Sequence, residues 1–317
     1  MTQASGALAI KPTPVATPPA ADPASGISIP SCPAVLNELR AEIGREDPDV
    51  GAIARLVVAD VALSVTVLRV VNSPLYGLSR KVESIAQAVS ILGLKRLAVL
   101  VTNVLVRQAL SCKGLDLDEF WERSNKRAFA MCSLAKIHRS IDADTAQSAG
   151  LLCDIGIPLL MQRFADYGET MKLADDFNVG IPLLLKQFPQ YAQIIASGHE
   201  ARPKGFTDIE FERHGLDHTK IGAMMARSWG LSDTLCQTIR HHHDQALLQD
   251  PTAPDVLRQL VAICFVAEFS IQRLGGVVET HEWAQGADAA LSALLWTARD
   301  MEDWADDLGA EISIGTG

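Results

Sequence analysis

The chain has 317 residues, of which 48% are hydrophobic and 21% are charged, and its formal net charge is −10. A chain of this size and composition can bury a sizeable core, which excludes general disorder. The acidic balance argues against a general nucleic-acid-coating protein, because phosphate binding depends on clustered lysine and arginine.

The sequence lacks clear signals for membrane insertion, secretion or a disulfide framework. Charged residues interrupt the apolar stretches before they reach the roughly 18–20 residues of a membrane helix. The N-terminus lacks the basic start and apolar core of a secretory signal. Cysteines occur at positions 32, 112, 132, 153, 236 and 264, and they form no Cys-x-x-Cys pair. We therefore expect buried free thiols, a cytoplasmic location and no contact with a membrane.

The chain divides into a leader, a long helical part and an acidic tail. Residues 1–28 contain five prolines, seven alanines and two charged residues, which predicts a disordered leader. From Ile29 onward apolar residues recur at helical spacing, and no period-two alternation indicates a strand. The predicted fold class is therefore all-α.

Caps, helix breakers and apolar periodicity together predict the individual helices. Asp49, Asp60, Ser84, Asp118 and Asp144 are expected to begin helices, and Gly44 and Gly93 to end them. The expected ranges are 33–43, 49–58, 60–71, 84–92, 94–110, 118–139, 144–163, 190–199, 208–213, 217–229, 232–243, 254–274 and 287–308.

Residues 277–317 carry nine acidic side chains and one arginine. The same segment contains Trp283, Trp296 and Trp304, whose large apolar side chains favour burial over exposure to solvent. We therefore expect an amphipathic acidic helix that docks on the rest of the molecule.

Candidate chemistry lies on the helices. Asp154 follows an apolar run, where a lone carboxylate is costly unless something pairs with it. His218 begins a helix that Asp217 can cap, and residues 241–243 are three histidines at the end of another. Each feature alone has a structural explanation, since histidines near a helix C-terminus favour the helix dipole. Together they suggest a divalent-metal site inside a helical bundle.

Several motifs in order point to one family. Residues 29–33 match a Leu-Pro-x-Leu-Pro opening, residues 69–77 match an Asn-Ser-x-x-Tyr/Phe-Gly turn, and residues 88–93 match an Ala-Ile-x-x-Leu-Gly helix end. A later motif is matched by Glu212, Gly215, His218, Gly222, Trp229, His242 and His243. From about Ile29 to Leu274 the chain therefore resembles the HDOD domain (HD-related output domain), a relative of the HD and HD-GYP metal phosphohydrolases.

The resemblance implies a multi-helix HD-like bundle with an N-terminal helical HDOD subdomain. The expected HDOD domain spans residues 29–275, with its N-terminal subdomain at 29–112 and a degenerate HD-like bundle at 113–275. The acidic C-terminal helical tail then occupies residues 276–317.

The chain departs from the metal-binding pattern of active HD relatives. Arg123 stands at the position of the first histidine, and Cys153-Asp154 replaces the His-Asp pair. Glu268 stands where the final aspartate is expected. The vestigial HD site that remains consists of Asp154, His218, His242 and His243, with Glu268 as a further possible ligand.

These substitutions argue against a working two-metal centre. Arginine stays protonated and only donates hydrogen bonds, so Arg123 cannot bind a cation. We expect it to pair with Asp154 and offset the burial of that carboxylate. Cys153 as a thiolate would favour soft ions. The sequence therefore predicts no catalytic residue, no bound metal and no cofactor.

Four functional hypotheses remain. The resemblance implies a non-catalytic bacterial module for signal transduction that binds protein partners. The alternative is an HD-type phosphohydrolase or cyclic-dinucleotide phosphodiesterase that binds iron or manganese, although Asp244-Gln245-Ala246 follows His243 in place of a Gly-Tyr-Pro signature. Nucleic-acid binding through the helix pair at 50–72 is disfavoured, because Arg55 and Arg69 are its only basic residues. Finally, the degenerate cleft could bind a nucleotide or anion through Arg123 and the histidines.

Overall fold

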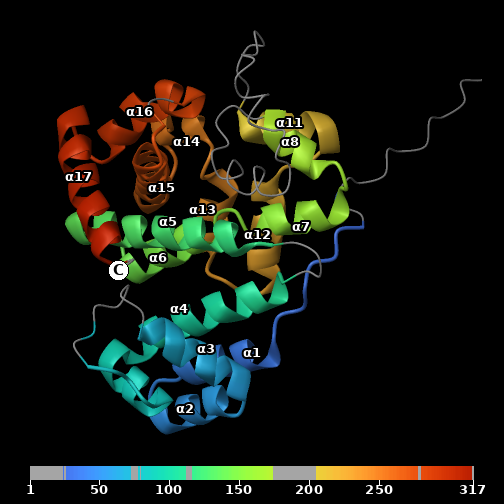
Figure 1. The fold of residues 1–317 in the computed structure, drawn as a ribbon, viewed down its shortest axis with the longest axis vertical. Helices are drawn as coiled ribbons and strands as arrows, with labels where there is room; N and C mark the ends of the chain where they lie inside the picture. The colour runs from blue at the N-terminus through green and yellow to red at the C-terminus, as the bar shows by residue number, and fades with distance from the viewer. Residues whose placement is uncertain are drawn as a thin grey trace, which may run out of the picture.

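A computed structural model describes residues 24, 26–72, 78, 80–111, 116–173, 205–277 and 280–315. Every regular element in these ranges is a helix, which confirms the predicted all-α class (Figure 1). Most of the predicted leader, the expected turn at 73–77 and the expected helix at 190–199 lie outside the described residues.

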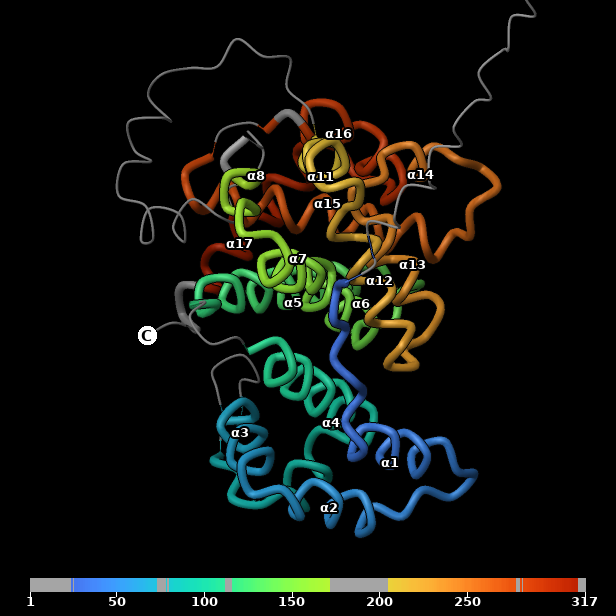
Figure 2. Tube along the Cα trace, turned by 90° about the vertical axis from the view of Figure 1, so that its right-hand side faces the viewer, coloured from blue at the N-terminus to red at the C-terminus, as the bar shows by residue number. Residues whose placement is uncertain are grey.

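Four helices form the N-terminal end of the molecule: α1 (Ala34–Ile43), α2 (Val50–Val58), α3 (Val61–Val71) and α4 (Ile85–Ala109). Their boundaries follow the predicted caps. The Asp49 side chain accepts hydrogen bonds from the backbone N–H groups of Gly51 and Ala52, and Asp60 accepts one from Leu63. Figures 1 and 2 show these helices together on one side of the α5–α6 pair.

α4 is bent at Gly93, whose φ of 77° is open to glycine but strained for other residues. By length and composition α4 could cross a membrane, because an 18-residue window within it has a mean hydropathy of 1.8, so the expectation that no segment reaches that length is corrected. In this fold α4 packs against α1, α2, α3 and α6 and buries ten of its residues, as a core helix does.

The middle of the molecule contains α5 (Asp118–Ile137), α6 (Ala143–Leu152) and α7 (Gly156–Arg163). α5 begins at Asp118 as predicted, although Leu117 occupies the N-cap position, and Asp142 rather than Asp144 caps α6. The single helix expected over 144–163 is wrong, because residues 153–155 form a turn between α6 and α7. That turn carries Asp154 off the helix.

The remaining helices lie mainly on the other side of α5 and α6 (Figure 2). They are α8 (Tyr167–Leu173), α11 (Phe206–His214), α12 (His218–Ser228), α13 (Asp233–His241), α14 (Gln245–Gln249), α15 (Asp255–Leu274), α16 (His281–Ala293) and α17 (Ala298–Gly315). α15 packs against α5 and α16 and is buried over most of its length.

The acidic tail forms two helices rather than the one expected over 287–308. Leu295, at the break, has a φ of 56°. Trp283 of α16 stacks on Phe269 of α15 with ring centroids 4.1 Å apart. Trp304 of α17 donates from Nε1 to the Ser133 hydroxyl of α5 at 3.4 Å. The tail is therefore anchored by its aromatic side chains.

Candidate functional site

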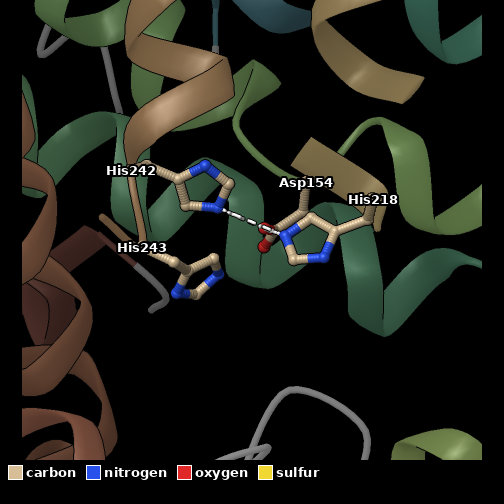
Figure 3. A group of neighbouring side chains, drawn as sticks. All are labelled: Asp154, His218, His242 and His243. Atoms are coloured by element: carbon tan, nitrogen blue, oxygen red, sulfur yellow. Dashed lines mark hydrogen bonds and ion pairs between the residues drawn. The ribbon is translucent and has the colours of Figure 1, made fainter. Parts of the chain in front are cut away.

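Three separate helix ends bring four of the predicted residues together. Asp154 lies in the turn between α6 and α7, His218 is the first residue of α12, and His242 and His243 directly follow α13. One ligand atom from each lies within 4.8 Å of the others, and Figure 3 shows the Asp154 carboxylate between the rings of His218 and His242. We call these four residues the His-Asp cluster.

Three potential ligand atoms converge at the centre of the cluster. His242 Nε2 lies 3.2 Å from Asp154 Oδ1, and His218 Nε2 lies 3.4 Å from the same oxygen. The two Nε2 atoms are 3.3 Å apart. Asp154, His218 and His242 are all buried, so water does not screen the electrostatic interactions between them.

The opposite ring nitrogen of each histidine faces a hydrogen-bond acceptor outside the cluster. His218 Nδ1 lies 2.7 Å from Glu210 Oε2, and His242 Nδ1 lies 2.8 Å from the Ile239 carbonyl oxygen. His243 Nδ1 lies 2.5 Å from Glu282 Oε1. An acceptor at Nδ1 fixes the proton there, which leaves Nε2 of the neutral ring free to accept or to ligate.

Glu210 is itself held rigidly. Its Oε2 also accepts from the His218 backbone N–H at 3.1 Å, and Tyr167 donates its hydroxyl proton to the other carboxylate oxygen. Burial raises the pKa of Tyr167 well above its usual value, and the adjacent Glu210 carboxylate raises it further. The phenol therefore stays protonated and keeps Glu210 aimed at His218.

The pKa values of the histidines diverge. Burial lowers the pKa of His218, but the Glu210 and Asp154 carboxylates outweigh this effect and raise it to about 10. Burial and the neighbouring His243 lower the pKa of His242 to about 3. At His243 burial also opposes the charge, but Glu282 raises the pKa above its usual value. His242 therefore keeps its lone pair at neutral pH.

An arginine that the sequence analysis did not select pairs with Asp154. Arg127 Nη1 lies 2.6 Å from Asp154 Oδ2 and 3.1 Å from Glu268 Oε2, and its Nε donates to the Gly150 carbonyl oxygen. Arg123 pairs with Glu268 instead. The expected Arg123–Asp154 ion pair is therefore corrected, because Arg127 lies one helical turn further along α5.

The guanidinium of Arg127 neutralises negative charge on the side of the site formed by Asp154 and Glu268. Burial raises the pKa of Asp154, but Arg127 and the two histidines hold it well below its usual value. The pKa of Glu268 is lowered by Arg123 and Arg127 against the opposing effect of burial. Both carboxylates are thus ionised and already neutralised by fixed cations.

Cys153 lies outside the His-Asp cluster. Its Sγ is 3.6 Å from Cys264 Sγ on α15, and both thiols are buried. The hydrogen bond between the two thiols and burial raise the pKa of Cys264 well above its usual value. Both thiols lie near Arg127, whose charge they influence.

A cavity of about 520 Å³ opens next to His243. Four carboxylate residues line it, against one arginine, Arg240: they are Asp208, Glu212, Asp217 and Asp244. His241 also lines this cavity and pairs with Asp244 at 3.0 Å rather than joining the cluster. The excess of carboxylates gives the approach to His243 an acidic character, which attracts cations and repels phosphate groups.

The sequence analysis missed three residues that complete the site: Arg127, Glu210 and Glu282. Arg127 could have been found from its i, i+4 spacing to Arg123, which places both on one helix face. Glu282 lies in the acidic tail, and only the docking of α16 brings it to His243. Sequence spacing gives no comparable signal for Glu210.

The donor set fits one metal ion and does not fit two. Three imidazoles and one carboxylate suit zinc, iron or nickel. Each imidazole also has the outer hydrogen-bond acceptor that is usual for metal-binding histidines. A second ion would have to use Asp154 and Glu268, where the Arg127 guanidinium already sits.

Comparison with known proteins agrees with this architecture. Residues 29–175 and 177–245 match the HDOD domain family. An uncharacterized protein from Treponema pallidum (strain Nichols) is 25% identical over 250 residues, which cover 78% of this chain and 43% of that protein. The chain therefore spans less than half of that relative's length.

Solved structures share the fold at low sequence identity. A proposed phosphohydrolase from Shewanella amazonensis SB2B is 22% identical with a TM-score of 0.61, over 90% of this chain and 94% of its own. An HDOD domain protein of unknown function from Geobacter sulfurreducens is 20% identical with a TM-score of 0.62, over 91% of each chain. A proposed signal transduction protein from Marinobacter aquaeolei VT8 is 18% identical with a TM-score of 0.62, over 91% of this chain and 59% of that one. With the family match over most of its length and the shared fold, the chain belongs to the HDOD domain family.

Proposed function

We propose that this protein is a non-catalytic regulatory module of bacterial signal transduction, located in the cytoplasm, that acts by binding a protein partner. One observation carries the proposal. The Arg127 guanidinium is buried, with its side chain 2% exposed, and bridges Asp154 and Glu268. A permanently protonated group cannot exchange for a metal ion or release a site for an attacking water.

The electrostatics of the approach support the same proposal. A phosphoester reaching His243 would pass a cavity wall with four carboxylates and one arginine. Arg123, which could have attracted an anion, is engaged by Glu268. These features also weigh against the nucleotide or anion ligand considered from the sequence. The regulatory role is further supported by the resemblance of the fold to a proposed signal transduction protein.

A second candidate is an HD-type metal-dependent phosphohydrolase, including a cyclic-dinucleotide phosphodiesterase. The observation that favours it is the His-Asp cluster, whose four ligand atoms lie within 4.8 Å of one another. A metal held there by Asp154 and the three histidines could supply a Lewis acid and an activated water. The phosphodiester would still have to bind without a second cation.

The test is a hydrolysis assay with metal-supplemented protein. Bis(p-nitrophenyl) phosphate and cyclic dinucleotides are incubated with wild-type protein in the presence of manganese, iron or zinc. We expect no turnover above that of the His242→Ala variant, which serves as the matched control for contaminating hydrolases. Turnover that is present in the wild type and lost in His242→Ala would overturn the proposal and support the phosphohydrolase.

A further inference from the structure

Three atoms that can ligate a cation meet in the His-Asp cluster. Asp154 Oδ1, His218 Nε2 and His242 Nε2 are 3.2 to 3.4 Å from one another (Figure 3). The outer nitrogens are committed to Glu210 and to the Ile239 carbonyl oxygen, so the lone pairs of the neutral rings point inward. In the metal-free protein a proton on His218 offsets the repulsion between these atoms, and a bound cation would take the place of that proton.

Around the cluster, carboxylates outnumber arginines by two. The carboxylates that contact the histidines or the adjacent arginines are Asp154, Glu210, Glu268 and Glu282. The fixed cations in the same network are Arg123 and Arg127. When the imidazoles are neutral, as metal ligands must be, this network carries two negative charges, and one divalent ion would balance them in place of the ring protons.

The positions of the two arginines decide how many ions can bind. Arg127 Nη1 lies between Asp154 Oδ2 and Glu268 Oε2, while the other oxygen of Asp154 faces the histidines. The Asp154 carboxylate is thus shared between a guanidinium on one side and the imidazoles on the other. In this arrangement the guanidinium takes the place of one cation and leaves room for a second on the histidine side.

We propose that the protein binds a single divalent transition-metal ion through Asp154, His218, His242 and His243, and that Arg127 replaces a second ion permanently. This inference rests on the proposed regulatory function and names its ligand: a metal ion that is bound but not used for phosphoester hydrolysis. The acidic cavity beside His243 gives a cation its route to the site.

The ion would join three parts of the fold. Its ligands come from the α6–α7 turn, the start of α12 and the end of α13, and Glu282 extends the connection to α16. Metal binding would therefore hold these elements in one arrangement, and loss of the ion would release them. A partner that contacts α12, α13 or the acidic tail could sense the difference.

The first measurement is the metal stoichiometry of the full chain. Protein stripped with a chelator is dialysed against zinc, and bound metal is measured by elemental mass spectrometry together with the melting temperature. We expect about one equivalent, a higher melting temperature with zinc, and loss of both effects in His242→Ala. Glu282→Gln should weaken zinc binding about 10–100-fold, because Glu282 orients His243. Glu302→Gln, in the same acidic tail but paired with Arg273, is the matched control and should bind like the wild type.

The second measurement tests the role of the arginines. Removing both guanidiniums in Arg123→Ala/Arg127→Ala frees Asp154 and Glu268 beside the Cys153 and Cys264 thiols, which zinc also accepts as ligands. We expect this double variant to bind a second equivalent of zinc. Arg127→Lys keeps the positive charge and should stay at one equivalent. Circular dichroism checks that each variant is folded.

The outcomes separate this inference from the proposed function. Less than about a tenth of an equivalent in the wild type would overturn the metal site, while the absence of hydrolysis would stand. Two equivalents in the wild type would show that Arg127 does not exclude the second ion. One equivalent together with hydrolysis would retain the metal site and overturn the regulatory function.

Discussion

His218 and His242 have Nε2 atoms 3.3 Å apart, yet their surroundings push their pKa values in opposite directions. The difference lies in the outer nitrogen. His218 faces the Glu210 carboxylate, which stabilises an imidazolium. His242 faces the neutral Ile239 carbonyl, and the positive charge of the neighbouring His243 disfavours its protonation. One proton on His218 can thus offset part of the negative charge when no metal is bound.

This difference predicts how the stability of the metal-free protein depends on pH. The pKa of His218 is raised from 6.5 to about 10 on folding, so the protonated ring stabilises the folded state. That contribution is complete below pH 6.5 and is lost as the pH rises through about 10. In the presence of a chelator, we expect the free energy of unfolding in urea to fall across this interval more in the wild type than in His218→Gln. Equal losses in the two proteins would contradict the assignment.

At the scale of elements, the pairing of α5 with α6 places Arg127 next to Asp154. Gly150 allows the two helices to approach closely, because a Cβ at this position would lie 2.7 Å from the Ala128 Cα. The close approach also lets Arg127 reach the Gly150 carbonyl oxygen at 2.7 Å. The turn that ends α6 then directs Asp154 toward both the arginine and the histidines.

The substitution Gly150→Ala tests this close contact. The added methyl group would meet the α5 backbone, so the helices must separate and the Arg127–Asp154 ion pair must lengthen. We expect a loss of about 1–3 kcal/mol in the free energy of unfolding, measured by urea denaturation. Gly205→Ala is the control, because its Cβ would lie 3.5 Å from Asp208 Oδ2, an ordinary contact. A variant Gly150→Ala as stable as this control would show that the helices can adjust.

At the scale of the whole molecule, the acidic tail belongs both to the core and to the site. Met301, Trp304 and Leu308 of α17 are buried, and Trp283 of α16 covers Phe269. Glu282 of α16 reaches His243. The apolar side of the tail thus fixes its position, while most of its acidic side chains remain exposed.

A chain that ends at residue 276 tests this arrangement. It loses α16 and α17, exposes the apolar side of α15 and removes the partner of His243. We expect a lower melting temperature by circular dichroism and increased binding of an apolar fluorescent dye. The matched control replaces Asp303, Asp306 and Asp307 by asparagine, which removes exposed charges but no buried contacts and should leave the melting temperature nearly unchanged. A lower melting temperature in the asparagine variant than in the truncated chain would mean that charge, rather than packing, holds the tail in place.

The sequence alone determined the helical class, most helix boundaries and the four residues of the His-Asp cluster. Local signals are sufficient for these features: Asp49 and Asp60 cap helices through bonds to their own neighbours, and Gly93 bends α4 through its own φ. The subdomain boundaries and the protein partner remain predictions.

Only the tertiary structure decided which charged groups meet. The break after α6, the pairing of Arg127 rather than Arg123 with Asp154, and the reach of Glu282 to His243 all depend on how distant helices pack. Two arginines one helical turn apart look equivalent in sequence, but their partners lie 27 and 145 residues away along the chain. Electrostatic pairing acts through space, whereas capping and periodicity act along the chain, and this difference separates what was predicted from what was not.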